Sequence, residues 1–446
     1  MPPDPSRLDA AVGRGRVVLI ALFFVSGAAS LVYEAVWNRL LVLQMGNTAY
    51  ALTTILTVFM GGLALGSFVG GRFAARLRDP LAAYGWLELG IGVYAAFVPL
   101  GIDAIAPLMQ LAYNEWFFSL ATFSFFQFLV CGAVLLLPVV AMGATLPIVS
   151  DFVARSGAGV GASVGLAYGI NTFGGFVGVM VGGLVLVPWL GLAYTNLAGA
   201  VLSASAGVAA LAIARRLGAP GPAHALAAAS EGGVDEIARR RGVAPWLLYA
   251  ALAVSGFAAM TYQVAWTRVI TLSIGSVTYS FPLIVGAFIG GLAVGAAVLG
   301  RLGDRRGLGT PLLVACQLGI AFVALNTIPT LGELPVRMTL AVLRYSDSFE
   351  ALQLAKFAAV FAVVFAPTFL MGGMLPLAAR AIAEQGRTGV GAAVGRCYAS
   401  NTFGTIAGSF AAGFVLVPAI GMQETIATAV VANAVVGAAL WMGSGM

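Results

Sequence analysis

Two carboxylates stand inside long apolar runs of the sequence, where an ionisable side chain is costly to bury. Glu34 lies in the segment SLVYEAVWNRL, and Glu88 lies in the segment YGWLELG. When the chain is aligned with itself, the matching positions in its second half are Gln263 and Gln317. A carboxylate at membrane depth needs a compensating cation or a proton. The pattern therefore predicts either proton coupling or recognition of a cationic amine.

Aromatic side chains accompany Glu34 and its counterpart in the second half. Tyr33 and Trp37 are four residues apart, as are Tyr262 and Trp266, so each pair shares one helix face. Aromatic ring faces attract ammonium groups, which favours a cationic amine. Anchoring of helices at the membrane interface is the alternative use of these Tyr and Trp residues.

The two carboxylates are not expected to form one site. Glu34 would lie roughly 26 Å from the start of its helix, near the outer surface, and Glu88 about 10 Å from the opposite surface. Pairing of Glu34 with Arg39, or with an arginine on another helix, is an alternative to a role in solute or proton binding. Asn171 and Asn401, each within the sequence NTFG, either line a pore or form hydrogen bonds between helices.

Residues suited to catalysis or metal binding are scarce. The one histidine, His224, falls in a polar linker, and Cys131, Cys316 and Cys397 lie singly in apolar stretches. No serine or cysteine therefore has a histidine partner within the membrane, and no cluster offers three metal ligands. We expect no metal and no cofactor.

The composition requires a membrane environment. Hydrophobic residues make up 60% of the 446 residues and charged residues 9%, and the mean hydropathy is +0.98. A water-soluble fold would lack the polar side chains to cover its surface. Apolar runs that reach the roughly 20 residues of a membrane-spanning helix recur along the chain. The sequence predicts an all-α membrane protein.

The chain contains an internal repeat. SGAASLVYEAVWNRL matches SGFAAMTYQVAWTRV at an offset of 229 residues, and the same offset aligns FMGGLALGSFVGGR with FIGGLAVGAAVLGR. With one inserted residue, VGLAYGINTFGG matches VGRCYASNTFGT. We expect six spans in each half, about twelve in all. An even number of spans per half makes the two repeats parallel, as in the two halves of a major facilitator transporter.

The repeat sets the expected domain organisation. It consists of an N-terminal segment (1–16), a first six-helix repeat (17–216), a linker (217–244) and a second six-helix repeat (245–443). Arginines occupy every second connection and the linker, so the positive-inside rule places both termini and the linker in the cytoplasm. The outer loop 331–356 has mixed charge and helical periodicity, and is expected to form an amphipathic surface helix.

The loop after the second helix of each half carries a charged pattern. Its second copy, GRLGDRRG, contains Arg301, Asp304 and Arg305, whereas the first copy, GRFAARLRDP, keeps Arg72 and Arg76 but has alanine at the position of the aspartate. The second copy resembles the signature loop of the major facilitator superfamily. That resemblance implies a gating role for these residues. A short positive-inside turn without a gating role is the alternative.

A second resemblance covers nearly the whole chain. SGAASLVYEAVWNRLL and GNTAYALTTILTVFMGGLALGSFVGGR are similar to the membrane module of bacterial proteins in which a transporter-like bundle is fused to a spermidine-synthase-like aminopropyltransferase domain. The glycine-rich strand-to-helix loop of such an enzyme domain is missing from this sequence, so the aminopropyltransferase activity does not carry over. The resemblance implies a multi-pass protein of the bacterial inner membrane, a polyamine-like solute, and a separate spermidine-synthase-like protein as a partner.

The function that the sequence predicts is secondary transport of a small organic solute, a polyamine or another organic cation, by alternating access. One alternative is a non-transporting membrane scaffold that docks or feeds a spermidine-synthase-like enzyme, and another is an intramembrane enzyme component. No nucleic-acid partner is expected. A transporter requires a water-accessible cavity with Glu34 or Glu88 on its wall, whereas a scaffold should have a tightly packed centre.

Overall fold

The chain is helical almost throughout the part that the computed structural model describes. The described residues are 5–45, 49–115, 120–154, 159–217, 243–275, 280–305, 308–385 and 389–445. Most of the linker expected at 217–244, with His224, lies outside these residues.

The helices of the first half follow the apolar runs of the first repeat. They are α1 (Pro5–Met45), α2 (Ala49–Ala74), α3 (Pro80–Glu115), α4 (Leu120–Ala154), α5 (Val160–Val181) and α6 (Val187–Leu217), with a π-helical turn η1 (Gly182–Leu186) between α5 and α6. Those of the second half are α8 (Pro245–Ile274), α9 (Ser280–Gly303), α10 (Gly309–Tyr345), α11 (Phe349–Ala383), α12 (Val390–Phe410) and α13 (Val417–Ser444), with η3 (Ala411–Leu416) between α12 and α13.

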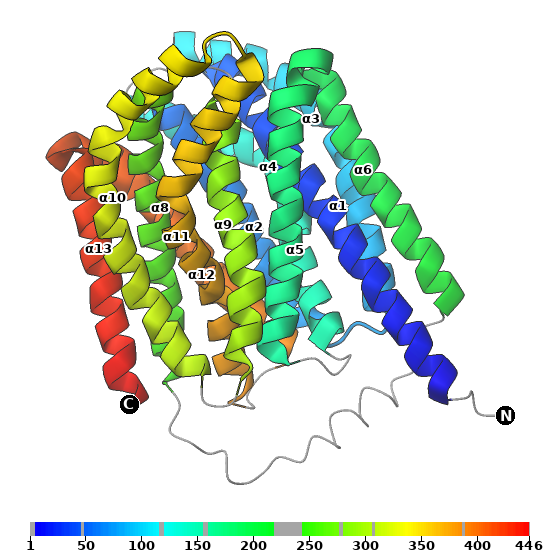
Figure 1. Ribbon diagram of the computed structural model, residues 1–446. Helices are drawn as coiled ribbons and strands as arrows, with labels where there is room; N and C mark the ends of the chain where they lie inside the picture. The colour runs from blue at the N-terminus through cyan, green and yellow to red at the C-terminus, as the bar shows by residue number, and fades with distance from the viewer. Residues whose placement is uncertain are drawn as a thin grey trace.

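Twelve membrane crossings arise from ten apolar segments within the described residues. Two of the ten segments, Val160–Arg216 and Val390–Ser444, are 57 and 55 residues long. Each is broken at a glycine with positive φ, Gly191 at 76° and Gly421 at 84°. The chain reverses there, so that α6 runs back in the direction opposite to α5 (Figure 1), and α1 packs against both helices. The expected all-α membrane fold of two six-helix repeats is confirmed.

The two halves meet along two helix pairs. Helix α5 of the first half packs against α9 of the second, and α12 of the second half packs against α2 of the first. Both chain termini lie on the same face of the bundle (Figure 1), as an even number of crossings requires. We call it the terminus face, and the opposite one the distal face. This arrangement makes the molecule a multi-pass membrane protein.

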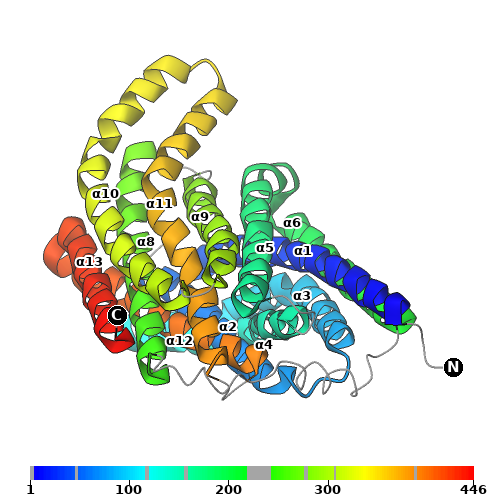
Figure 2. The same ribbon diagram turned by 60° about the horizontal axis from the view of Figure 1, so that its bottom comes forward.

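The segment 331–356 differs from the expectation of a separate amphipathic surface helix. It forms the end of α10 and the beginning of α11, which extend together beyond the other helices as a long hairpin (Figures 1 and 2). Within α10, Arg337 pairs with Glu333 one turn earlier, at 2.7 Å, which adds a small stabilisation to this exposed part of the helix. Ser348 then caps α11 by accepting a hydrogen bond from the Ala351 N–H at 3.2 Å.

The turn at Gly191 provides a test of this topology. Its φ of 76° and ψ of 177° belong to a region that only glycine occupies readily, while a Cβ there would meet no neighbouring atom. We expect Gly191→Ala to lose about 1–3 kcal/mol of stability through backbone strain alone, measured by thermal unfolding in detergent micelles. Gly132→Ala is the control, because Gly132 is helical and also has open space around its Cβ position. Equal unfolding temperatures for the two variants would contradict the strained turn.

Candidate functional site

A cavity of about 860 Å³ lies between the two halves. On α1 it is lined from Ser26 to Leu43, and on α8 from Ser255 to Arg268. Both stretches are the later parts of helices that start at the terminus face. The cavity therefore extends from the middle of the bundle toward the distal face.

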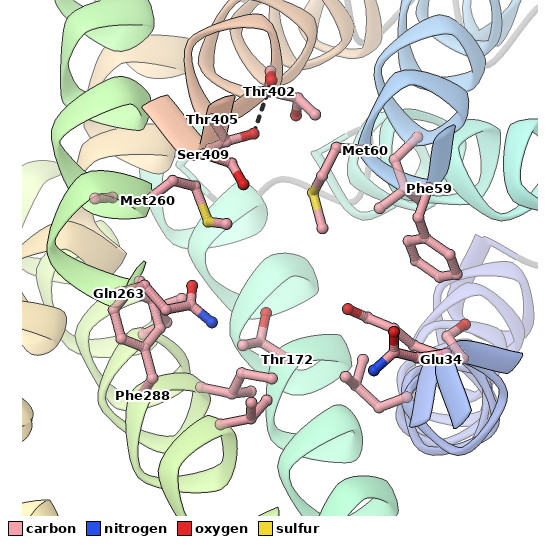
Figure 3. A pocket seen from close by; sticks show the side chains of 18 of the residues that line it. Glu34, Phe59, Met60, Thr172, Met260, Gln263, Phe288, Thr402, Thr405 and Ser409 are labelled. Atoms are coloured by element: carbon pink, nitrogen blue, oxygen red, sulfur yellow. Dashed lines mark hydrogen bonds between the residues drawn. The ribbon is translucent and has the colours of Figure 1, made fainter. Parts of the chain in front are cut away.

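Polar side chains at matching positions of the two halves face each other across this cavity. Glu34 on α1 and Gln263 on α8 approach from opposite sides, with Thr172 of α5 between them (Figure 3). Asn171 and Asn401 also line the cavity, and the Asn171 side-chain amide donates to the Phe23 carbonyl at 3.1 Å. The repeated NTFG motif thus serves both of the uses considered for it, a cavity wall and helix packing.

The charges on the cavity wall are few. Glu34 is the one carboxylate among the described residues that line it, and Arg39 and Arg268 are the two cations. Arg39 follows Glu34 on α1, and Arg268 follows Gln263 on α8, by more than one helical turn, so both arginines lie nearer the distal face. Tyr168 and Tyr398, with ring centroids 6.4 Å apart in an edge-to-face arrangement, meet at the lining nearest the terminus face.

Glu88 and Gln317 lie away from the cavity wall. Their side chains are buried within the first and the second half respectively, and neither is among the described residues that line the cavity. Glu88 accepts a hydrogen bond from the Ser26 hydroxyl, and Ser26 itself lines the cavity. The structure therefore places Glu34 and Gln263 on the wall of one cavity. Glu88 lies behind that wall, with the Ser26 side chain between it and the cavity.

The aromatic pairs are packed against each other instead of presenting open ring faces. Tyr33 and Trp37 stack at 5.0 Å, and Tyr262 and Trp266 at 5.1 Å. All four side chains are at most 1% exposed, although Trp37 touches the cavity. Close stacking within each pair occupies the ring faces that an ammonium group would need.

The two tryptophans also have hydrogen-bond partners inside their own halves. The Trp37 indole N–H donates to the Asn196 side chain at 2.7 Å, and the Trp266 indole N–H donates to Thr327 at 3.2 Å. Partnered indoles of this kind anchor α1 and α8 to neighbouring helices. The aromatic pairs therefore contribute to packing within each half, and ammonium binding by their ring faces stays a prediction.

On the terminus face, Asp304 joins the second half to the first. This residue follows α9, and its two carboxylate oxygens accept hydrogen bonds from the Gly161 and Ala162 N–H groups at 2.9 and 2.6 Å. These are free N–H groups of the first turn of α5, where a negative charge is favourable. Arg380 of α11 holds the aspartate in place, with its Nε 3.3 Å from Asp304 Oδ1 and a second nitrogen donating to the Gly303 carbonyl.

A different residue makes the matching contact from the first half. Asp151 near the end of α4 accepts a hydrogen bond from the Gly391 N–H at 3.2 Å, in the first turn of α12. In the self-alignment Gly391 matches Gly161, whereas Asp151 matches Arg380. The aspartate of the first-half loop, Asp79, instead caps α3 by accepting from the Ala82 N–H at 2.9 Å. The acid that caps a helix of the opposite half thus follows α9 in the second half, but lies near the end of α4 in the first half.

The arginines of the signature loops do not make these interhelical contacts in the described structure. Arg72, Arg76, Arg301 and Arg305 are exposed, and the Arg72 guanidinium lies 4.5 Å from the centre of the Phe68 ring.

Two residues that take part in these contacts on the terminus face, Arg380 and Asp151, were absent from the sequence prediction. The self-alignment carried a signal for them, because an arginine opposite an aspartate at a helix end is an unusual exchange between otherwise similar repeats.

The helix backbones also touch on this face. A Cβ on Gly165 of α5 would lie 2.4 Å from the Ala296 carbonyl oxygen, and a Cβ on Gly395 of α12 would lie 2.5 Å from that of Ser67. Glycine is needed at both positions because any side chain would push the helices apart. With α5 on α9 and α12 on α2 in direct contact, the terminus face is closed while the cavity extends toward the distal face.

Solved structures share this fold. A proton:xylose symporter, XylE, bound to 6-bromo-6-deoxy-D-glucose superposes with a TM-score of 0.54 at 14% identity, covering 98% of this chain and 96% of that one. A bacterial homologue of the iron transporter ferroportin in the outward-facing state gives a TM-score of 0.57 at 12% identity, covering 97% and 100%. The same kind of protein with soaked iron gives 0.55 at 13%, covering 97% and 99%.

These likenesses define the class of fold. The chain has the fold of the major facilitator superfamily, as its signature loop predicted. No protein-family model and no curated protein matches the sequence.

The two capping aspartates generate a prediction about closure. Replacing both, Asp304→Asn with Asp151→Asn, removes the charge that favours the helix N-termini, so α5 and α12 should separate from the opposite half more often. The readout is maleimide labelling of Ser163→Cys, a buried site in the first turns of α5, in a background without the native cysteines. We expect labelling from the terminus face to accelerate at least several-fold.

Asp103→Asn is the matched control, because Asp103 is an exposed residue of α3 away from this contact. Labelling that stays as slow in the double variant as in the control would show that the aspartates do not hold the face closed.

Proposed function

We propose that this protein is a secondary transporter of a small organic solute that works by alternating access. The observation that supports the proposal most directly is the cavity of about 860 Å³ between the halves, combined with helix contacts that close one face. A scaffold without transport activity was expected to have a packed centre, and a cavity with a charged wall fits that role less well. The fold adds support, because it is shared with a sugar symporter and with a homologue of an iron transporter.

The closed terminus face corresponds to an outward-facing state if the termini are cytoplasmic. Arginines gather on the terminus face, including Arg215 and Arg216 at the end of α6 and the signature-loop arginines, which supports that orientation in a bacterial inner membrane. In the transport cycle, a solute would enter from the distal face. The aspartate caps on α5 and α12 would then release, and the halves would rock to expose the solute to the cytoplasm.

One carboxylate on the cavity wall favours a solute with an amino group, and the two arginines of the wall, Arg39 and Arg268, lie nearer the distal face. Glu34 supplies the wall's one carboxylate among the described residues, and a carboxylate at that depth gains from a cationic partner. Gln263 on the opposite wall offers a neutral hydrogen-bonding group. We therefore propose an organic cation such as a polyamine. A spermidine-synthase-like protein is the separate partner that this solute would imply.

Uptake by purified protein in proteoliposomes tests the solute class. Labelled spermidine and putrescine should enter wild-type vesicles, and Glu34→Gln should weaken their apparent affinity roughly 10- to 100-fold, because it removes a charge-assisted hydrogen bond of about 1.5–3 kcal/mol. Glu424→Gln should leave uptake unchanged, since Glu424 is an exposed carboxylate of α13 outside the cavity. If neither amine binds or moves, the polyamine proposal is wrong. An equal loss of apparent affinity in Glu34→Gln and Glu424→Gln would contradict a specific role of Glu34 in binding the solute.

A further inference from the structure

Glu88 is a buried carboxyl group in the first half that the cavity does not use directly. Its side chain is 1% exposed. One carboxyl oxygen accepts a hydrogen bond from the Ser26 hydroxyl, whereas the other oxygen, Oε2, has no hydrogen-bond partner among the described residues. None of the ion pairs recorded between described residues includes Glu88.

Among the described residues, the groups recorded around Glu88 supply no positive charge. Helix α3 packs against α1, α4 and α6. The titratable neighbours are Tyr33 on α1 and Tyr84 on α3 itself, and α6 contributes the hydroxyl of Ser203. The one charged residue of α4 is Asp151, which is bound to the start of α12. An ionised carboxylate in this place would stand without a cation, which is costly in a low-dielectric interior.

The second half contains the same three-helix arrangement built from neutral groups. Gln317, the counterpart of Glu88, donates to the Asn433 side chain at 2.7 Å, and Asn433 donates to the Tyr262 hydroxyl at 3.0 Å. Asn433 matches Ser203, and Tyr262 matches Tyr33. Packing of α10 against α8 and α13 therefore needs no acid at this position. The carboxyl group of Glu88 supplies something that packing alone does not require, namely an exchangeable proton.

Ser26 provides the route to that proton. Its side chain lines the cavity and donates to Glu88, so one hydroxyl separates the buried carboxyl group from cavity water. A serine hydroxyl donates one hydrogen bond and accepts others. It can take a proton from a hydronium ion in the cavity water, which leaves neutral water, while passing its own proton to Glu88 Oε1, and rotation of the hydroxyl resets it. Each transfer moves one proton, and no other reactant is needed.

We propose that Glu88 is a proton-binding site, loaded and unloaded from the cavity through Ser26, and that it couples solute movement to the proton gradient. The coupling part rests on the proposed transport function. Proton binding itself is supported by the burial of Glu88, by its hydrogen bond with Ser26 and by the lack of an ion pair to Glu88 among the described residues. Glu34 would hold the solute while Glu88 carries the proton, which assigns the two carboxyl groups different tasks.

Infrared difference spectroscopy in lipid bilayers tests proton binding without a solute. A protonated Glu88 should give a carboxylic-acid C=O band that shifts in D₂O, is lost in Glu88→Gln and is retained in Glu34→Gln. Glu88→Gln reproduces the residue that the second half carries at Gln317, and its thermal unfolding checks that it folds. In Ser26→Ala the band should persist while its hydrogen–deuterium exchange slows at least tenfold. A band that survives in Glu88→Gln, or exchange as fast in Ser26→Ala as in wild type, would overturn the proposal.

A transport measurement tests the coupling separately. In proteoliposomes, Glu88→Gln should abolish the accumulation of labelled spermidine that a pH gradient drives in the wild type, but should retain spermidine exchange without a gradient. Gradient-driven accumulation at the wild-type level in Glu88→Gln would contradict coupling through this residue. If wild-type protein moves no spermidine, the proposed solute fails, and the infrared result alone decides whether Glu88 binds a proton.

Discussion

Contacts between aspartate side chains and the first turns of α5 and α12 join the two halves of this molecule on the terminus face. Asp304 and Asp151 each reach from one half to the start of a helix in the other, where free N–H groups and the helix dipole favour a negative charge. Glycines let the paired helices touch behind them. Because the halves are joined on the terminus face, the space between them extends toward the distal face, and Glu34 stands on the wall of that space.

Functional differences between two similar halves are concentrated in a few exchanges of charge. Glu34 and Glu88 in the first half correspond to glutamines in the second, while Asp151 corresponds to Arg380. The repeated backbone supplies the rocking bundle, and both halves close by the same kind of cap although different residues provide it. Under the proposed function, the acids of the first half act on a solute and a proton, and their neutral counterparts in the second half show that packing at these positions does not depend on charge.

Much of this organisation follows from local patterns, and the rest depends on contacts between distant parts of the chain. The repeat and the apolar runs predicted the helices. The sequence named Glu34 and Glu88 as candidates for the cavity wall, and the structure places Glu34 on it and Glu88 behind Ser26. The pairing of Asp151 with Gly391 joins residues 240 positions apart, and no local pattern specifies it. Helical spacing shows that each Tyr and Trp pair shares one face but not what covers that face, so the sequence left ammonium binding and helix anchoring as alternatives.

The distances between the halves on the two faces test the central claim most directly. Spin labels at Leu43 and Leu272, exposed at the distal ends of α1 and α8, and at Phe73 and Leu308, exposed on the terminus face, report one distance per face by pulsed electron paramagnetic resonance in nanodiscs. When Asp304 and Asp151 are both replaced by asparagine, the terminus-face distance should lengthen and the distal distance should shorten. Distances that stay fixed on both faces, or change in the same sense, would contradict a rocking bundle held by these two aspartates.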